Sequence, residues 1–111
     1  MASQQEVQNT LAQAQAYQQQ IQSILLQKEN ITLQLNEIKK ALDELSKTAE
    51  TEIYKMSGPI LIKTSKSAVK KELMEKQELL SMKMKTLERG EKKTKGKLDE
   101  LKQSLTQEMG G

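Results

Sequence analysis

Apolar residues recur every seven positions along the first half of the chain. Two rows carry the repeat, one starting at Val7 and ending at Leu42, the other starting at Thr10 and ending at Leu45. Nine of the twelve positions are aliphatic or Ala, and Thr10, Tyr17 and Lys28 are the exceptions. A seven-residue repeat kept over six heptads winds a helix around a partner helix. The pattern therefore predicts a helix over residues 4–48 whose apolar seam needs a second helix.

The second half of the chain repeats this pattern less regularly. One row consists of Leu73, Leu80, Leu87, Thr94 and Leu101, and the other of Gln77, Met84, Glu91, Leu98 and Leu105. A hydroxyl of Thr64, Ser65 or Ser67 is suited to cap the first turn of such a helix. We expect a helix over residues 66–109 that folds back antiparallel onto the first one.

Residues 88–97 interrupt the second repeat, because they include no apolar residue and contain both Gly90 and Gly96. Each glycine costs a helix interior about 1 kcal/mol relative to Ala. If the chain turns near residue 58, Lys28 lies within about one turn of Glu91 and Thr94. Two interpretations stay open: a polar layer that fixes the register of the helices, and a loosely packed, flexible stretch.

Two short runs rich in β-branched and apolar residues flank Gly58 and Pro59 between the helices. Pro59 has no amide hydrogen and Gly58 can adopt a positive φ, so the pair predicts a turn within a β-hairpin over residues 51–64. A lone hairpin is marginally stable and exposes two unpaired edges. We therefore expect its strands to join those of other subunits in a closed β-barrel. The predicted assembly residues are Ile53, Tyr54, Met56, Ile60, Leu61 and Ile62. The alternative is a loop whose apolar residues cap the coiled coil.

Composition agrees with a thin seam between helices and argues against a catalytic protein. The 111 residues include 2% aromatic residues and no Cys or His, so disulfides, thiolate chemistry, imidazole bases and the usual zinc ligands are excluded. No phosphate-binding glycine loop, nucleophile elbow or calcium loop is present. We predict a single, mostly α domain over residues 1–111 that is not an enzyme and needs no cofactor or metal.

The longest apolar runs, at 24–26 and 60–62, are far shorter than the roughly 20 residues of a membrane span. The Gln-rich first residues have neither the basic start nor the apolar core of a signal peptide. We expect a soluble, cytoplasmic protein that does not act at a membrane.

Three segments together resemble the beta-class subunit of archaeal prefoldin, a hexameric co-chaperone. They are YQQQIQ at 17–22, LNEIKKALDEL at 35–45, and IYK at 53–55 followed by GPILIKT at 58–64. The resemblance spans nearly the whole chain. It implies an antiparallel coiled coil with a hairpin at the bend, in a hetero-hexamer of two alpha and four beta subunits.

The resemblance also implies a function. Members of this family hold unfolded proteins between the tips of their coiled coils without ATP and deliver them to a group II chaperonin. In this chain the tips are the two termini, and the matching apolar positions are Val7, Leu11, Leu101, Leu105 and Met109. The same residues also fit ordinary seam positions of the coiled coil.

A structural scaffold or tethering subunit is the alternative function, although a tether needs no apolar hairpin at its bend. The net charge is +3, and the basic residues are densest at Lys92, Lys93, Lys95 and Lys97. Such a run is most often a solvated helix face. Docking to an acidic surface of a chaperonin is a second interpretation. Nucleic acid is the least favoured partner, because stacking aromatic residues are missing around the run.

Overall fold

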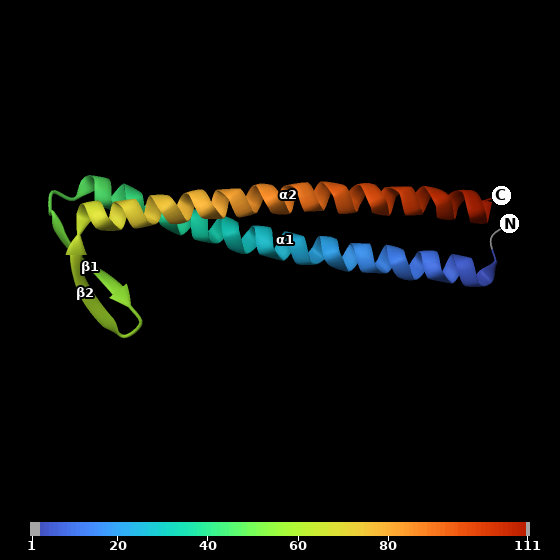
Figure 1. Cartoon of the computed structure of the whole chain (residues 1–111), viewed down its shortest axis with the longest axis horizontal. Helices are drawn as coiled ribbons and strands as arrows, with labels where there is room; N and C mark the ends of the chain where they lie inside the picture. Colours follow the sequence, from blue (N-terminus) through green and yellow to red (C-terminus); the bar gives the residue numbers. More distant parts are fainter. Residues whose placement is uncertain (1–2, 111) are drawn as a thin grey trace. The chain divides into compact units, whose positions relative to one another are not determined.

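The computed structural model describes residues 3–110, with side chains as far as Gln107. Its elements follow the order α1 (Gln4–Lys47), β1 (Glu52–Ser57), β2 (Ile60–Ser65) and α2 (Lys66–Gly110) (Figure 1). In chain order, one antiparallel hairpin thus lies between two long helices. The predicted fold class, a two-helix coiled coil with a hairpin at the bend, is confirmed.

Both helices begin at a hydroxyl cap. The amide of Glu6 donates to Ser3 Oγ at 3.1 Å, and the amide of Ala68 donates to Ser65 Oγ at 3.1 Å. Each bond satisfies one of the amides that have no partner in the first turn of a helix. Ser3 therefore caps α1, and Ser65 is the one of the three proposed residues that caps α2.

Contacts divide the chain into two compact units. The first contains α1 up to Glu29 and α2 from Lys85 onward, and the second contains Asn30–Met84. In the second unit the buried apolar residues are Ile31, Ile38, Leu45 and Leu80. In the first unit they are Ile24 and Leu98, joined by Thr94. None of the described side chains is wholly enclosed, because a seam between two helices covers each residue from one side only.

The hairpin lies in the second unit and has a tight two-residue turn. Ser57 pairs with Ile60, and the ladder continues to the pair of Glu52 with Ser65. Gly58 has a φ of 58°, while the ring of Pro59 holds its φ negative. A positive φ only at the first central residue is typical of a type II′ turn, whose twist suits a hairpin. The expected Gly-Pro turn is therefore present.

Candidate functional site

The strand register divides the side chains of the hairpin between two faces. Residues directly opposite one another in an antiparallel pair lie on the same face. One face therefore carries Tyr54, Met56 and Leu61, and the other carries Ile53, Ile60 and Ile62. Each face thus carries three large apolar side chains, whereas a hairpin with one solvated face would place its apolar residues on the other face alone.

Most of this apolar surface is open to solvent in the isolated chain. Met56 is 75% exposed and Leu61 65% exposed, and Tyr54, Ile60 and Ile62 are also exposed. Ile53 alone among the six predicted assembly residues is half-buried. Several large apolar side chains exposed together in this way mark an interaction site in soluble proteins.

An ion pair connects the hairpin to the following helix. Lys55 Nζ lies 3.0 Å from Glu72 Oε2 on α2, and Lys63 Nζ lies 3.1 Å from Glu52 Oε2 across the two strands. Lys66 Nζ also donates to the carbonyl oxygen of Thr48 at 2.9 Å. These contacts orient the hairpin within the second unit without covering its apolar side chains.

The predicted client-binding residues lie in the first unit. Leu11 is 46% exposed, while Val7, Leu101 and Leu105 are half-buried. The side chain of Met109 lies outside the described residues. The four described residues are therefore accessible in part, which is compatible with both a seam position and a contact to a client.

A polar layer crosses the seam of the first unit. Lys28 Nζ donates to Glu91 Oε1 at 3.0 Å, and Lys95 Nζ lies 3.6 Å from Glu91 Oε2. The side chains of Lys28 and Glu91 are 26% and 13% exposed, and Thr94 beside them is only 5% exposed. The hydrogen bond from Lys28 lowers the pKa of Glu91 below its ordinary value of 4.5, against the opposing effect of burial.

The contact between Lys28 and Glu91 favours the interpretation of residues 88–97 as part of a polar layer that fixes the register of the helices, and not as a loosely packed, flexible stretch. The helix α2 continues through the stretch, and a Cβ added to Gly90 would lie 3.8 Å from Ile24 Cδ1, at ordinary packing distance. The stretch is thus regular helix in contact with α1. A charged pair at this position allows one register and penalises others, which would leave a charge facing an apolar residue.

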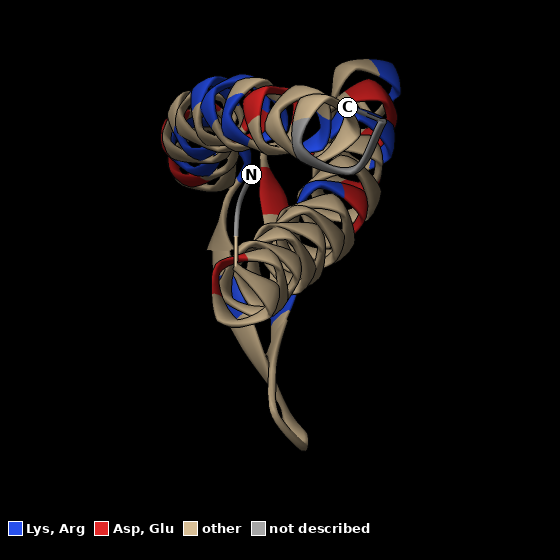
Figure 2. Cartoon of the chain, turned by 90° about the vertical axis from the view of Figure 1, so that its right-hand side faces the viewer, with Lys and Arg blue, Asp and Glu red and all other residues tan. Residues whose placement is uncertain are grey.

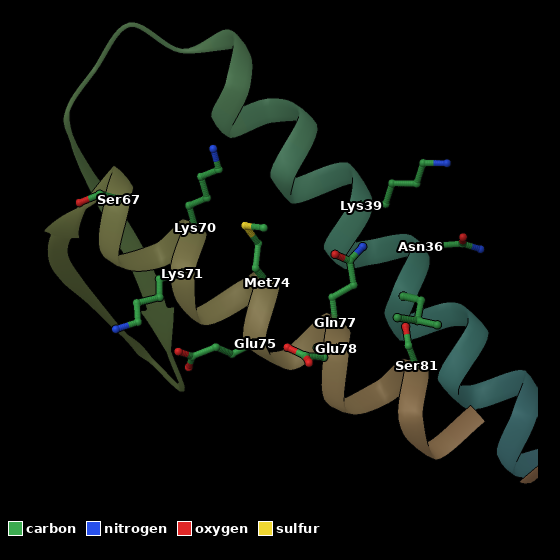
Figure 3. Close-up of a pocket in the computed structure, with 11 residues that line it drawn as sticks. Asn36, Lys39, Ser67, Lys70, Lys71, Met74, Glu75, Gln77, Glu78 and Ser81 are labelled. Atoms are coloured by element: carbon green, nitrogen blue, oxygen red, sulfur yellow. The ribbon is translucent and has the colours of Figure 1, made fainter. Parts of the chain in front are cut away.

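A groove of the second unit lies between α1 and α2 and has a volume of about 890 Å³ (Figure 3). Leu35 and Met74 supply apolar surface, while Lys39, Lys71 and Glu75 are among the charged residues around it. Ligand pockets instead enclose most of their ligand and have few, convergent polar groups. Over the described residues no cluster of carboxylates is arranged to hold a metal. This groove has the character of a solvated helix surface.

The family profile described as "Prefoldin subunit" matches residues 8–111. The chain belongs to the prefoldin subunit family. The prefoldin beta subunit of Thermococcus onnurineus is 46% identical over 101 residues, which cover 90% of this chain and 87% of that protein. The prefoldin beta subunit of Archaeoglobus fulgidus is 42% identical with the same coverage.

A relative of known structure has the same fold as this chain. The crystal structure of the prefoldin beta subunit from Thermococcus strain KS-1 has a TM-score of 0.84 and 41% identity, and the match covers 92% of this chain and 90% of that one. Prefoldins are co-chaperones, and a subunit is part of an oligomeric complex. The resemblance to beta-class prefoldin inferred from the sequence is thereby confirmed.

Some exposed apolar residues were missed by the sequence reasoning. Leu26 and Leu33 on α1, and Met82 on α2, are exposed outside the heptad seam. The run of three apolar residues at 24–26 contained the signal, because only part of such a run can face one partner helix. Neither long helix, within the residues described, has a segment apolar enough to cross a bilayer.

Proposed function

We propose that this chain is the beta subunit of a cytoplasmic prefoldin hexamer, with two alpha and four beta subunits, that holds unfolded proteins without ATP. The observation that carries the proposal is the exposed apolar hairpin. A lone two-stranded hairpin is at best marginally stable in water, and apolar residues exposed on both of its faces add to the need for a partner. Strands from other subunits would cover these residues and pair with the open edges. The assembly places the hairpins in a shared β-barrel and leaves the helix termini free for clients.

The energy available to such an assembly follows from the exposures. Fully burying a large apolar side chain contributes about 1.5–3 kcal/mol. Tyr54, Met56, Ile60, Leu61 and Ile62 are between 42% and 75% exposed. Covering all five contributes roughly 5–9 kcal/mol per subunit before the entropy of association is subtracted. This is enough to support a stable oligomer when several subunits contribute.

Client capture is assigned to Val7, Leu11, Leu101, Leu105 and Met109. Near the termini the seam of α1 weakens to Thr10 and Ala14, so neighbouring apolar residues are less fully used by the partner helix. Leu11 is already half exposed. Unfolded chains need a surface that adapts to many sequences, and a flexible methionine such as Met109 suits that purpose.

The holdase is tested by diluting a denatured enzyme from guanidinium into the assembled hexamer. Light scattering should fall at one hexamer per enzyme molecule, and it should not fall for a chain that lacks residues 1–11 and 101–111. The truncated chain should still assemble with the same number of subunits, as its oligomer mass would show. Unchanged scattering with the intact hexamer would refute the holdase, and loss of the oligomer on truncation would refute the separation of tips from hairpin.

A point substitution makes the same test sharper. Leu11→Ser should weaken protection, because it removes exposed apolar surface near the terminus. Leu33→Ser is the matched control, since Leu33 is similarly exposed on the same helix but lies in the second unit. Equal effects of the two substitutions would show that general surface hydrophobicity, and not the tip, binds the client.

Delivery to a group II chaperonin is the last part of the proposal and rests on the family alone. Adding such a chaperonin with ATP to the complex of hexamer and client should raise the yield of refolded enzyme. A structural scaffold, the alternative function, would assemble in the same way but would neither suppress aggregation nor increase that yield.

A further inference from the structure

The outer face of α2 in the first unit carries a row of basic side chains. Lys85, Arg89 and Lys92 follow one another at intervals of four and three residues, which places them on one line of a helix. All three are exposed, whereas the seam residues Thr94 and Leu98 are buried, so the row lies on the side of α2 away from α1. We call Lys85, Arg89 and Lys92 the basic stripe.

The charges of the basic stripe are not neutralised by ion pairs. Among the described residues, the pairs within 4 Å involve Lys28, Lys47, Lys55, Lys63 and Lys95, and none involves the stripe. Glu88 is beside the stripe, but it is one carboxylate against three cations in the same shallow depression. Glu91, the other glutamate nearby, is bound by Lys28.

Within the first unit, α1 carries two acidic residues, Glu6 and Glu29, one at each end of a long uncharged stretch. Residues 7–27 of α1 contain no charged residue, whereas residues 85–97 of α2 contain six basic residues and two glutamates, a net charge of +4. Figure 2 shows this difference, with basic residues concentrated on α2 and the N-terminal part of α1 nearly free of charge. The positive potential over this part of the unit therefore remains available to a partner.

We infer that the basic stripe binds acidic segments of unfolded client proteins, and so gives the proposed holdase a preference for acidic clients. This inference rests on the proposed function. An unfolded chain can bring carboxylates to each of the three cations, and the planar guanidinium of Arg89 can hold one of them through two parallel hydrogen bonds. The apolar tip residues then bind the apolar part of the same client.

Nucleic acid fits the stripe less well than an acidic polypeptide does. Binding of single strands combines basic grooves with aromatic rings on which bases stack. Residues 85–107 contain no aromatic residue, and Tyr17, the aromatic residue of the first unit, is half-buried with Lys97 Nζ 6.0 Å from its ring. Without a stacking surface, the stripe is suited to carboxylates on a flexible chain.

Two fluorescein-labelled disordered peptides of 20 residues test the inference against the assembled hexamer. They share the same apolar residues, and one carries six glutamates where the other carries six lysines. Fluorescence anisotropy at 50 mM NaCl should show about tenfold tighter binding of the acidic peptide, as three exposed ion pairs imply. The preference should disappear at 500 mM NaCl, because exposed charges are then screened.

The triple variant Lys85→Gln, Arg89→Gln, Lys92→Gln should lose the preference but keep its protection of an uncharged client. The control variant Lys39→Gln, Lys70→Gln, Lys71→Gln removes equal charge from the second unit and should keep the preference. Equal binding of both peptides by the unmodified hexamer would overturn the inference, as would a preference that survives in the triple variant. Tighter binding of a 20-nucleotide single-stranded DNA, abolished in the triple variant, would overturn it in favour of nucleic acid. If the hexamer protects no client at all, the proposed function fails instead.

Discussion

Replacing Gly96 by Ala in the interior of α2 should stabilise the protein. Gly96 lies in regular helix, and a Cβ built at this position has no atom within 4 Å, so a methyl group fits without strain. Gly90→Ala should do the same, because its Cβ would lie at ordinary contact distance, 3.8 Å, from Ile24 Cδ1. In both cases Ala restricts the unfolded chain and favours the helical backbone.

The expected magnitude follows from helix propensity. Ala is favoured over Gly in a helix interior by about 0.8–1 kcal/mol. Gly90→Ala should equal or slightly exceed Gly96→Ala, because its methyl group also covers part of Ile24. The two sites are six residues apart and share no contact, so the double substitution should approach about 2 kcal/mol.

Equilibrium unfolding in guanidinium, followed by circular dichroism at 222 nm, measures these differences. The subunit concentration must be the same throughout, because dissociation of an oligomer makes its stability depend on concentration. Gly58→Ala is the matched control with the opposite sign. Gly58 has a φ of 58°, where a side chain costs about 1–2 kcal/mol, so this variant should unfold at lower denaturant.

The refuting result is a lower unfolding midpoint for Gly96→Ala or Gly90→Ala. It would show that residues 88–97 do not form regular helix in solution and that their glycines serve a bend or a loose stretch. An unchanged midpoint for Gly58→Ala would count against the type II′ turn.

Three further predictions concern single contacts. The pKa of Glu91 is lowered in the folded state, so the contribution of its carboxylate to stability is complete above pH 4.5. This contribution is lost as the pH falls through the lower folded pKa. Unfolding curves of Glu91→Gln should therefore show a smaller loss of stability between pH 5 and pH 3 than those of the unmodified protein. Ser65→Ala should cost about 1 kcal/mol of unfolding free energy, because it removes the cap of α2, whereas Ser104→Ala on the exposed face should leave it nearly unchanged. Leu61→Lys should lower the oligomer mass in light scattering, while Leu79→Lys, at a similarly exposed site on α2, should not; equal masses for both variants would contradict assembly through the hairpin.

Much of the architecture was predictable because helices and tight turns depend on local sequence. The heptad rows predicted two helices, and Gly58-Pro59 predicted the turn between two short strands. The antiparallel fold then brought Lys28 within about a turn of Glu91, and the structure places them in direct contact. In each case a repeat, or a residue with restricted backbone angles, carried the information.

Burial was less predictable than the helices themselves. The heptad positions Ile24, Ile31, Ile38 and Leu45 are all buried, yet the alternate row is only half-buried at Ile21, Leu35 and Leu42. Periodicity identifies the face of a helix that meets a partner, but the depth of each residue depends on which side chains the partner places opposite. For the same reason, the choice of Ser65 among three possible caps required the structure.

The candidate surfaces, too, were predictable from the sequence only in part. The sequence by itself determined the apolar character of the hairpin, the polar interruption of the seam, and the excess of lysine near the end of α2. Only the tertiary structure decided which apolar residues remain exposed, which carboxylate Lys28 binds, and that Lys85, Arg89 and Lys92 have no carboxylate partner among the described residues. The physical reason is that composition and spacing are properties of one segment, whereas exposure and pairing depend on residues brought close from distant parts of the chain.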